Sequence, residues 1–489
     1  MTDLYTNLRV PMTTSRSSRG QSLSISTALT AIALCLGGCA AVPNLGPKPE
    51  VRSAPSVTRG LSPGGQAEFP KADWWSQFGD PQLAALIDEA LRGSPTLAAA
   101  DARARRAEGY SQAAGAALLP TASASGSAGW SKQSYNNGFP RQFVPQGWQQ
   151  TGRASLDLSY EIDFFGKNRA ALRAAHADQL AARIESEAAR LALATSVAAT
   201  WADLGRAGAD QALARDALRL RQESADLVRR RVANGLDTRA ELRQADAAVA
   251  SAKAQLSSAD EQIELIRNAL AALLGAGPER GATIAPPDTV PHAVSIPANL
   301  PLELVARRAD IAAAKARVEA AAARIKVARA AFYPNINLLA LVGVQSLGLS
   351  NLTASGSDIG QATGSISLPI FEGGRLSGNY RIARADYDES VAQYDETLVR
   401  AVHEVADAIA SQQAIESQAA AATEAVTAAR EAYDLARRRY QGGLSAYVSV
   451  LLAEDSLLAA RRQLAATEAR SFSINVQLIR ALGGGFSAQ

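Results

Sequence analysis

Few residues of this chain have the types and spacing that chemistry requires. Residues 60–64, GLSPG, match the serine hydrolase nucleophile pattern by letter, but they contain a proline and lie in a Pro/Gly-rich stretch, not between a strand and a helix. Gly166-Lys167 lacks the glycine five residues earlier that a phosphate-binding loop needs. The sequence therefore predicts neither an enzyme nor a cofactor. No metal site is expected, because the Cys and His residues are too scattered for an ordinary Cys/His zinc site: Cys35, Cys39, His176, His292 and His403.

Cys39 is the residue with the clearest covalent chemistry. Residues 1–22 are polar and carry arginines, and residues 23–38 form an apolar run that is short for a membrane span but typical of a signal-peptide core. The run ends in LGGC, which resembles a bacterial lipobox, where the cysteine sulfur takes a lipid such as palmitate. We expect a lipoprotein signal peptide at 1–38; the alternative is an ordinary cleavage site with an incidental cysteine. Because Ala40 and not Asp follows, the outer membrane is favoured.

Composition points to long helices. Hydrophobic residues make up 47% of the 489 residues but aromatic residues only 5%, so alanine supplies much of the apolar content. The net charge of +3 argues against a nucleic-acid partner. No segment after the signal has 18 consecutive apolar residues, so a helical membrane span is not expected.

The sequence contains an internal repeat. Residues 96–120 match 310–334, and RRRVANGL at 229–236 matches RRRYQGGL at 437–444. A proline-rich connector, 276–301, joins the repeats. We expect a lipidated tether at 39–72, a first repeat at 73–292 and a second at 293–489, each with the order helix, strand, strand, very long helix, turn, long helix.

The long helices carry a coiled-coil pattern. Heptad positions in 242–273 and 450–481 are filled by aliphatic residues and alanine, so the helices should pack closely side by side. The first very long helix, from about 167 to 233, should be about 100 Å long. This pattern alone fits a closed helical bundle equally well.

The alternation of side chains in the expected strands favours a location in a membrane. In SLDLSYEID, residues 155–163, aliphatic and aromatic side chains alternate with Asp157, Glu161 and Asp163, which suits a water-filled lumen on one face and lipid on the other. The other expected strands are 121–130, 335–345 and 363–371. A soluble half-buried sheet is the alternative. Four strands cannot close a barrel in lipid, so copies must pool them: two copies give eight strands and three give twelve.

The chain resembles the TolC-like outer membrane efflux protein family, and within it the NodT/OprM-type lipoproteins that serve resistance–nodulation–division (RND) pumps. The resemblance covers nearly the whole mature chain. It is carried by Trp74-Trp75 with Phe78, Asp80 and Leu83, and by SYEIDFFGKNRAA at 159–171, NLPLELVARRADI at 299–311, ARAAFYPNINL at 328–338, SLPIFEGGRLSGN at 367–379 and RRRYQGGLSAYVSVLLAE at 437–454.

The resemblance implies a mainly α protein with a membrane β-barrel: a homotrimer, a twelve-stranded barrel and a periplasmic tunnel of long coiled-coil helices. It implies a passive duct for drugs or other small toxic compounds across the outer membrane of a Gram-negative bacterium, opened by a periplasmic adaptor (membrane fusion) protein and energised by an inner-membrane RND pump. The alternatives are a channel for type I protein secretion and a coiled-coil lipoprotein without a pore.

In this family the helix–turn–helix tips close the periplasmic entrance. The resemblance places Tyr440 and Gly443 at the family's Tyr and Gly, whereas Ser449 and Leu452 stand where acidic rings are common. An acidic ring is then available only from Asp237 and Glu241, or from Glu454 and Asp455 deeper along the helix. Two arginine triplets and a turn glycine are candidates for tip docking, the alternative being simple charge complementarity at helix C-termini: Arg229, Arg230, Arg231, Gly235, Arg437, Arg438 and Arg439.

If acids of the first repeat narrow the entrance, the double substitution Asp237→Ala with Glu241→Ala should change single-channel conductance or cation preference. Planar bilayer recordings measure both. Unchanged conductance and selectivity would remove this assignment.

Overall fold

The computed structural model describes residues 42–52, 71, 73–287 and 308–486. The chain divides into two compact units, and each is considered by itself. The strand unit contains residues 119–167 and 326–382, and the helical unit contains 46–118, 168–325 and 383–489, within the described ranges. Cys39 and the expected signal peptide lie outside the described residues.

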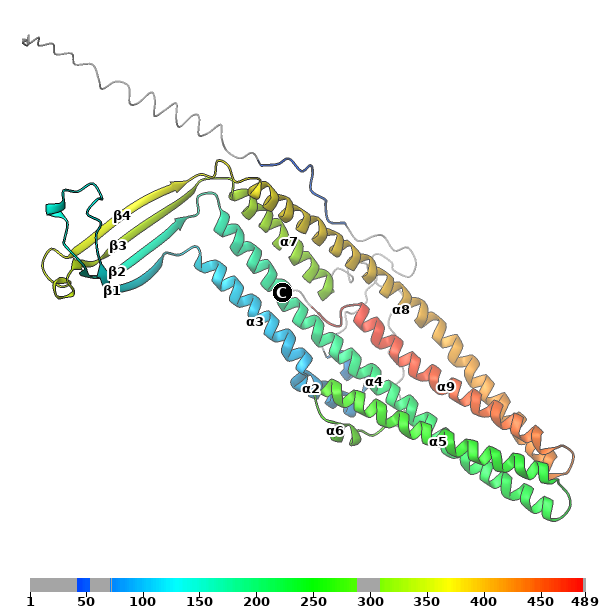
Figure 1. The fold of residues 1–489 in the computed structure, drawn as a ribbon. Coiled ribbons are helices and arrows are strands. Elements are labelled where there is room, and N and C mark those ends of the chain that lie inside the picture. The colour runs from blue at the N-terminus through cyan, green and yellow to red at the C-terminus, as the bar shows by residue number, and fades with distance from the viewer. Residues whose placement is uncertain (1–41, 53–70, 72, 288–307, 487–489) are drawn as a thin grey trace, which may run out of the picture. The chain divides into compact units, whose positions relative to one another are not determined.

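The strand unit holds one antiparallel sheet of four strands in the order β1-β2-β3-β4 (Figure 1). The strands are β1 (Thr121–Ser131), β2 (Gln149–Ile162), β3 (Asn335–Leu347) and β4 (Asp358–Ser367). One short 3₁₀ turn, η2 (Arg141–Phe143), lies between β1 and β2, and another, η4 (Leu349–Asn351), lies between β3 and β4. The two repeats therefore contribute one hairpin each, joined through β2 and β3.

The register places side chains of like character opposite one another over most of the sheet. Leu156 lies opposite Ala124 and Val342, while Asp157 lies opposite Ser123 and Leu341. Because side chains alternate along each strand, an aliphatic stripe of β2 meets aliphatic neighbours, and the acidic stripe meets mostly hydroxyl and amide side chains. Leu339 and Leu341 interrupt the polar face. The predicted alternation of a polar and an apolar face is confirmed.

Two of the predicted strands had wrong bounds. β2 begins at Gln149 instead of 155, and β4 occupies Asp358–Ser367 instead of 363–371. Gly152, Ala154, Gly360 and Ala362 occupy the apolar face there and provide little hydrophobic signal, so pairing with β1 and β3, not side-chain pattern, extends these strands. Pro369 lacks the N–H that a ladder needs, which agrees with the early end of β4.

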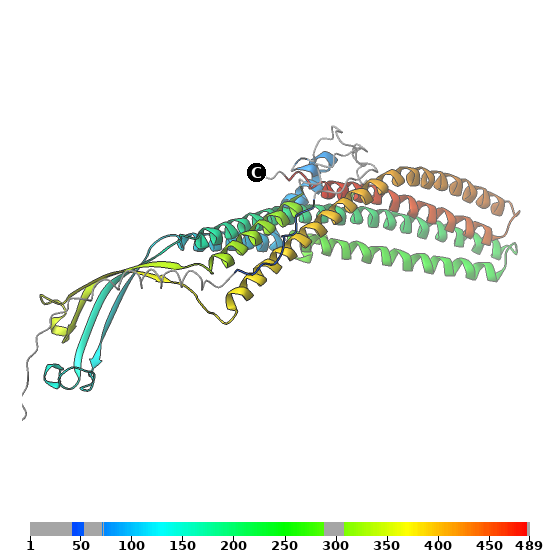
Figure 2. The same ribbon diagram turned by 90° about the horizontal axis from the view of Figure 1, so that it is seen from above.

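The helical unit contains most of the long helices. The first repeat supplies α3 (Pro95–Ala116), α4 (Lys167–Ala233) and α5 (Arg239–Leu274), and the second supplies α7 (Ala309–Ala330), α8 (Arg375–Gln441) and α9 (Tyr447–Ala481). α4 and α8 each have 67 residues, and both cross into the helical unit from the strand unit. The α4–α5 and α8–α9 hairpins lie side by side (Figure 2). The predicted order of elements is confirmed in both repeats.

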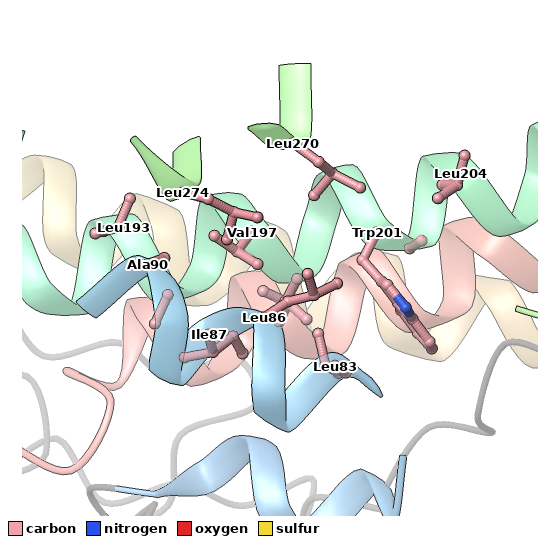
Figure 3. Packing of buried hydrophobic residues seen from close by; sticks show 14 of the residues in the cluster. Leu83, Leu86, Ile87, Ala90, Leu193, Val197, Trp201, Leu204, Leu270 and Leu274 are labelled. Atoms are coloured by element: carbon pink, nitrogen blue, oxygen red, sulfur yellow. The ribbon is translucent and has the colours of Figure 1, made fainter. Parts of the chain in front are cut away.

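Short elements complete the unit: η1 (Trp74–Phe78), α2 (Pro81–Gly93) and α6 (Pro278–Ala282). Asp80 begins α2 as its N-cap, since its carboxylate accepts a hydrogen bond of 2.7 Å from the Leu83 amide. In Figure 3, Leu83, Leu86 and Ile87 of α2 point into a buried cluster with side chains of α4 and α5. Trp201 of α4 belongs to this cluster, is fully buried, and contacts Phe472 of α9.

Residues 46–52 of the expected tether run along α8 and contact its side chains. The guanidinium of Arg384 donates to the carbonyl oxygens of Gly46 and Pro47, and the Tyr387 hydroxyl donates to the Pro49 carbonyl at 3.1 Å. Arg52 pairs with Asp395 at 3.2 Å. Residues 46–52 form neither helix nor strand, so side chains of α8 satisfy part of their backbone.

Among the residues described, no helix is both long enough and apolar enough to cross a membrane.

Gly275 and Gly235 allow a matched test of packing. Both have positive φ, +75° and +71°, but a Cβ at Gly275 would lie 2.4 Å from the Gly93 carbonyl oxygen, whereas a Cβ at Gly235 would meet nothing within 4 Å. Each alanine substitution should cost about 1–2 kcal/mol of backbone strain. Gly275→Ala should cost about 1–3 kcal/mol more for overpacking. Thermal unfolding of the purified variants measures the difference, and equal midpoints would contradict the tight contact.

Candidate functional site

Two helical hairpin tips form the candidate site, one from each repeat. α4 ends at Ala233 and α8 at Gln441, and Gly235 and Gly443 follow in the left-handed conformation. The amide of Leu236 donates to the Arg231 carbonyl, and the amide of Leu444 donates to the Arg439 carbonyl, both at 2.8 Å. The repeats thus close their hairpins by the same C-cap geometry. This C-cap requires a positive φ at Gly235 and Gly443, which glycine adopts without strain.

A network of three side chains joins the tips of the two repeats. The Tyr440 hydroxyl donates to Oδ2 of Asp237 at 2.6 Å, and Nε of Arg231 lies 3.0 Å from the same oxygen. The Arg231 guanidinium also lies over the Tyr440 ring, 4.9 Å from its centre. We call Arg231, Asp237 and Tyr440 the tip network. It links the α4–α5 turn to the end of α8 across 203 residues of sequence.

The tip network is shielded from water. The side chain of Asp237 is only 6% exposed, and Tyr440 is buried. Burial, then the hydrogen bond to Asp237, raises the pKa of the Tyr440 hydroxyl well above its ordinary value of 10.0. The hydroxyl therefore stays protonated and remains a donor throughout the physiological range. Its acceptor carries a charge, which makes this a strong hydrogen bond.

Glu241 has a different structural partner. Its carboxylate accepts from the backbone amide of Thr238 at 2.7 Å, and the Glu241 amide donates to the Thr238 hydroxyl at 3.4 Å. This capping box begins α5. Within one chain, Asp237 is paired with Arg231, and Glu241 caps a helix. The acidic ring stays a prediction, and these contacts give both acids a second role.

The arginine triplets divide into paired and exposed members. Arg229 contacts Asp226 at 2.5 Å and Asp246 at 3.6 Å, and Arg231 belongs to the tip network. The other candidates are exposed on the ends of α4 and α8: Arg230, Arg437, Arg438 and Arg439. Exposed leucines follow both turns, with Leu236 65% and Leu444 73% accessible. The tips therefore present cations and apolar side chains together, and docking through them stays a prediction.

A second charged group lies deeper between the hairpins. Arg221 of α4 reaches Glu454 of α9 at 3.2 Å and Asp455 at 2.5 Å, and it donates to the Ala248 carbonyl of α5 at 3.3 Å. We call Arg221, Glu454 and Asp455 the ion cluster. Sequence reasoning named both acids but missed Arg221. The available signal was an arginine inside the buried stripe of α4, between Ala217 and Ala225.

The strand unit places the expected lumen residues along one face. Asp157 accepts hydrogen bonds from the hydroxyls of Ser125 at 3.2 Å and Ser155 at 3.0 Å. Glu161 forms an ion pair with Lys167 at 2.6 Å, and Asp163 follows the end of β2. That this face lines a lumen stays a prediction.

In the parts of the chain that the structure describes, no three His, Cys, Asp or Glu residues gather where they could hold a metal ion.

Comparisons with known proteins converge on one family. The sequence profile of the family described as "Outer membrane efflux protein" matches residues 86–276 and 300–484, one segment in each repeat. The chain is 31% identical to the fusaric acid resistance protein FusA of Burkholderia cepacia over 74% of its own length and 69% of that protein. It is 30% identical to the cation efflux system protein CusC of Escherichia coli K12, covering 79% of this chain and 83% of that one.

A solved structure agrees with the sequence comparisons. The outer membrane protein VceC of Vibrio cholerae superimposes with a TM-score of 0.81 at 43% identity, covering 86% of this chain and all of that one. This likeness therefore extends over both units of the fold.

The tip network predicts a specific effect of one hydroxyl. Tyr440→Phe removes the donor to Asp237 but keeps the ring, and a hydrogen bond to a charged group contributes about 1.5–3 kcal/mol. Amide hydrogen exchange at residues 233–242 should accelerate about tenfold to a hundredfold as the tip opens more often.

Tyr447→Phe is the matched control for that measurement. Tyr447 forms an aromatic pair with Tyr440, and its buried hydroxyl takes no part in the tip network, so its loss should leave exchange at the tip unchanged. Equal exchange in the wild type and in Tyr440→Phe would show that the tip network does not hold the tips together.

Proposed function

Because the chain belongs to the outer membrane efflux protein family, we propose that this outer membrane efflux channel is the passive export duct of a tripartite pump. Its family profile matches both repeats, and this observation carries the functional assignment. Beyond this assignment, we propose how the chain assembles, which proteins it works with and which compounds it exports.

The proposed assembly is a homotrimer whose sheets close one twelve-stranded barrel. The sheet of one chain has two edges, β1 and β4, and it exposes aliphatic side chains such as Val342 and Ile366. Unpaired backbone groups at an edge are too costly in lipid, so each β1 should pair with β4 of a neighbouring copy. Three copies of four strands leave room for a polar lumen lined by Asp157 and Glu161. The long helices then form a periplasmic tunnel below the barrel.

The proposed energy source lies outside the chain. An inner-membrane RND pump would drive export, and a periplasmic adaptor would engage the tips and open them. Exposed arginines and leucines at both tips support a docking surface of mixed charge and apolar character. The lipid on Cys39 would anchor each copy in the outer membrane.

The proposed cargo is small toxic compounds, including drugs. FusA is named for resistance to an organic acid and CusC for cation efflux, yet the chain is 31% and 30% identical to them. Since the similarity does not separate these cargoes, we place cargo selection with the pump and treat the duct as permissive.

A photo-reactive residue at Leu444 or Leu236 tests the partners. Both side chains are exposed and neither caps a helix, so the substitutions should preserve the tips. In cells, each probe should capture an adaptor of an RND system, identified by mass spectrometry. A probe at Leu265, 55% exposed on α5 away from the turn, is the matched control and should not.

Two outcomes of this experiment would contradict the proposal. Capture of an adaptor from an ATP-driven secretion system would support type I protein secretion instead. Capture of only neighbouring copies of this chain, in cells that express an RND pump and its adaptor, would contradict docking through the tips.

A further inference from the structure

The ion cluster lies where the two repeats pack against each other. Arg221 and Glu454 are 233 residues apart in sequence, and their side chains are 7% and 1% exposed. The surrounding packing includes Ala225 and Val228 of α4 and Val450 and Leu457 of α9. A buried charge in such surroundings is costly unless it is fully paired.

The cluster contains one cation and two carboxylates. Asp455 is 61% exposed, so water screens its charge, but Glu454 is buried. One oxygen of Glu454, Oε1, accepts from Arg221, while the other, Oε2, is buried without a hydrogen-bond partner in the described part of the chain. Glu454 is therefore the incompletely compensated member of the cluster, and Oε2 is the atom where a proton can bind.

Arg221 is the cation that acts on Glu454, and the other titratable groups around this carboxylate add no positive charge. α4 supplies Arg221, α8 supplies Tyr433, and α9 supplies Tyr447 and Asp455. α5 supplies the Ala248 carbonyl, which accepts from Arg221. Burial, and then the charge of Glu454, raises the pKa of Tyr433 and raises that of Tyr447 to about 12, so both phenols remain neutral. Within the described residues, Glu454 thus has Arg221 as its counter-charge, and Arg221 also pairs with Asp455.

We propose that the ion cluster is a second latch above the tip network, in which Arg221 positions α9 against α4 and protonation of Glu454 strengthens the closed packing. This inference rests on the proposed function, because the packed hairpins are taken as the closed entrance of a duct. Arg221 and Glu454 are positioning residues here and touch no cargo.

The direction of the effect follows from proton linkage. Burial, the largest influence, raises the pKa of Glu454 above its ordinary value of 4.5, against the opposing effect of Arg221. When the hairpins separate, Glu454 meets water and its pKa returns toward 4.5. The closed form thus binds the proton more tightly than the open form. Acidification favours closing as pH falls from the raised pKa toward the ordinary one, and that advantage is lost as pH rises through the raised pKa.

Single-channel recording of the intact protein across this pH window tests the inference. The open probability of the wild type should fall as pH is lowered, by up to about tenfold per pH unit for each cluster that must open. Glu454→Gln, which has the shape of the protonated acid, should remove this dependence and hold the channel at the low open probability that the wild type reaches in acid. Glu468→Gln, an exposed acid on the same helix, should behave like the wild type.

Arg221→Lys provides a second variant if Glu454→Gln does not assemble. Lysine keeps the charge but loses the forked contacts to Glu454, Asp455 and the Ala248 carbonyl. The open probability should rise at every pH, while the dependence on pH should persist.

The outcomes separate this inference from the proposed function. A conducting channel in which Glu454→Gln keeps the pH dependence of the wild type, or in which Arg221→Lys opens no more often, would overturn the latch and leave the duct intact. A protein that conducts at no pH, even with the tip network broken by Tyr440→Phe, would contradict the duct itself.

Discussion

Close packing of long helices is the constraint on which the rest of this structure depends. Alanines such as Ala217, Ala225, Ala245 and Ala252 occupy buried faces of α4 and α5, and small side chains let helix axes approach closely. At such short separation, a charged side chain on a packed face is costly unless a charge or a hydrogen bond from a neighbouring helix compensates it. The tip network and the ion cluster both provide such compensation, because each pairs a charged side chain of one hairpin with a side chain of the other.

Both polar contacts join one repeat to the other. Asp237 and Arg221 belong to the α4–α5 hairpin, while Tyr440 and Glu454 belong to α8 and α9. In the proposed duct, opening would change how the helices pack, and contacts between the hairpins would resist that change. The apolar side chains around them supply packing without direction, whereas hydrogen bonds and ion pairs favour one alignment of the helices. The polar residues are therefore well suited to distinguish a closed arrangement from an open one.

The sheet, like the helical part, is built from one hairpin of each repeat, but it must present an apolar face on one side and a polar face on the other. Each repeat supplies one hairpin, and the register brings the aliphatic stripe of β2 beside that of β3. Hydroxyl groups of Ser125 and Ser155 surround Asp157 on the opposite face. A sheet with two such faces suits a boundary between lipid and water. Its apolar side chains can face lipid and need no hydrophobic core of the protein to cover them.

The sequence by itself determined the elements and the faces they present. Heptad patterns indicated the second helix of each hairpin, Gly235 and Gly443 marked the turns, and alternation in 155–163 defined the two faces of a strand. These features are local, since a turn needs a residue that tolerates positive φ, and a strand repeats every two residues. The same locality explains the errors in β2 and β4, whose missed ends carry glycine and alanine and are held by neighbouring strands.

Only the tertiary structure decided which charges meet. Asp237, Glu241, Glu454 and Asp455 were equivalent as acids in the sequence, yet one accepts from Tyr440, one caps α5 and two share Arg221. Periodicity indicates which side of a helix a residue occupies, but it does not specify which helix lies opposite or at what height. Apart from the local capping box of Thr238 and Glu241, those partners are fixed by packing between segments more than 200 residues apart, as between Asp237 and Tyr440 at a separation of 203. A local pattern does not specify contacts over that distance.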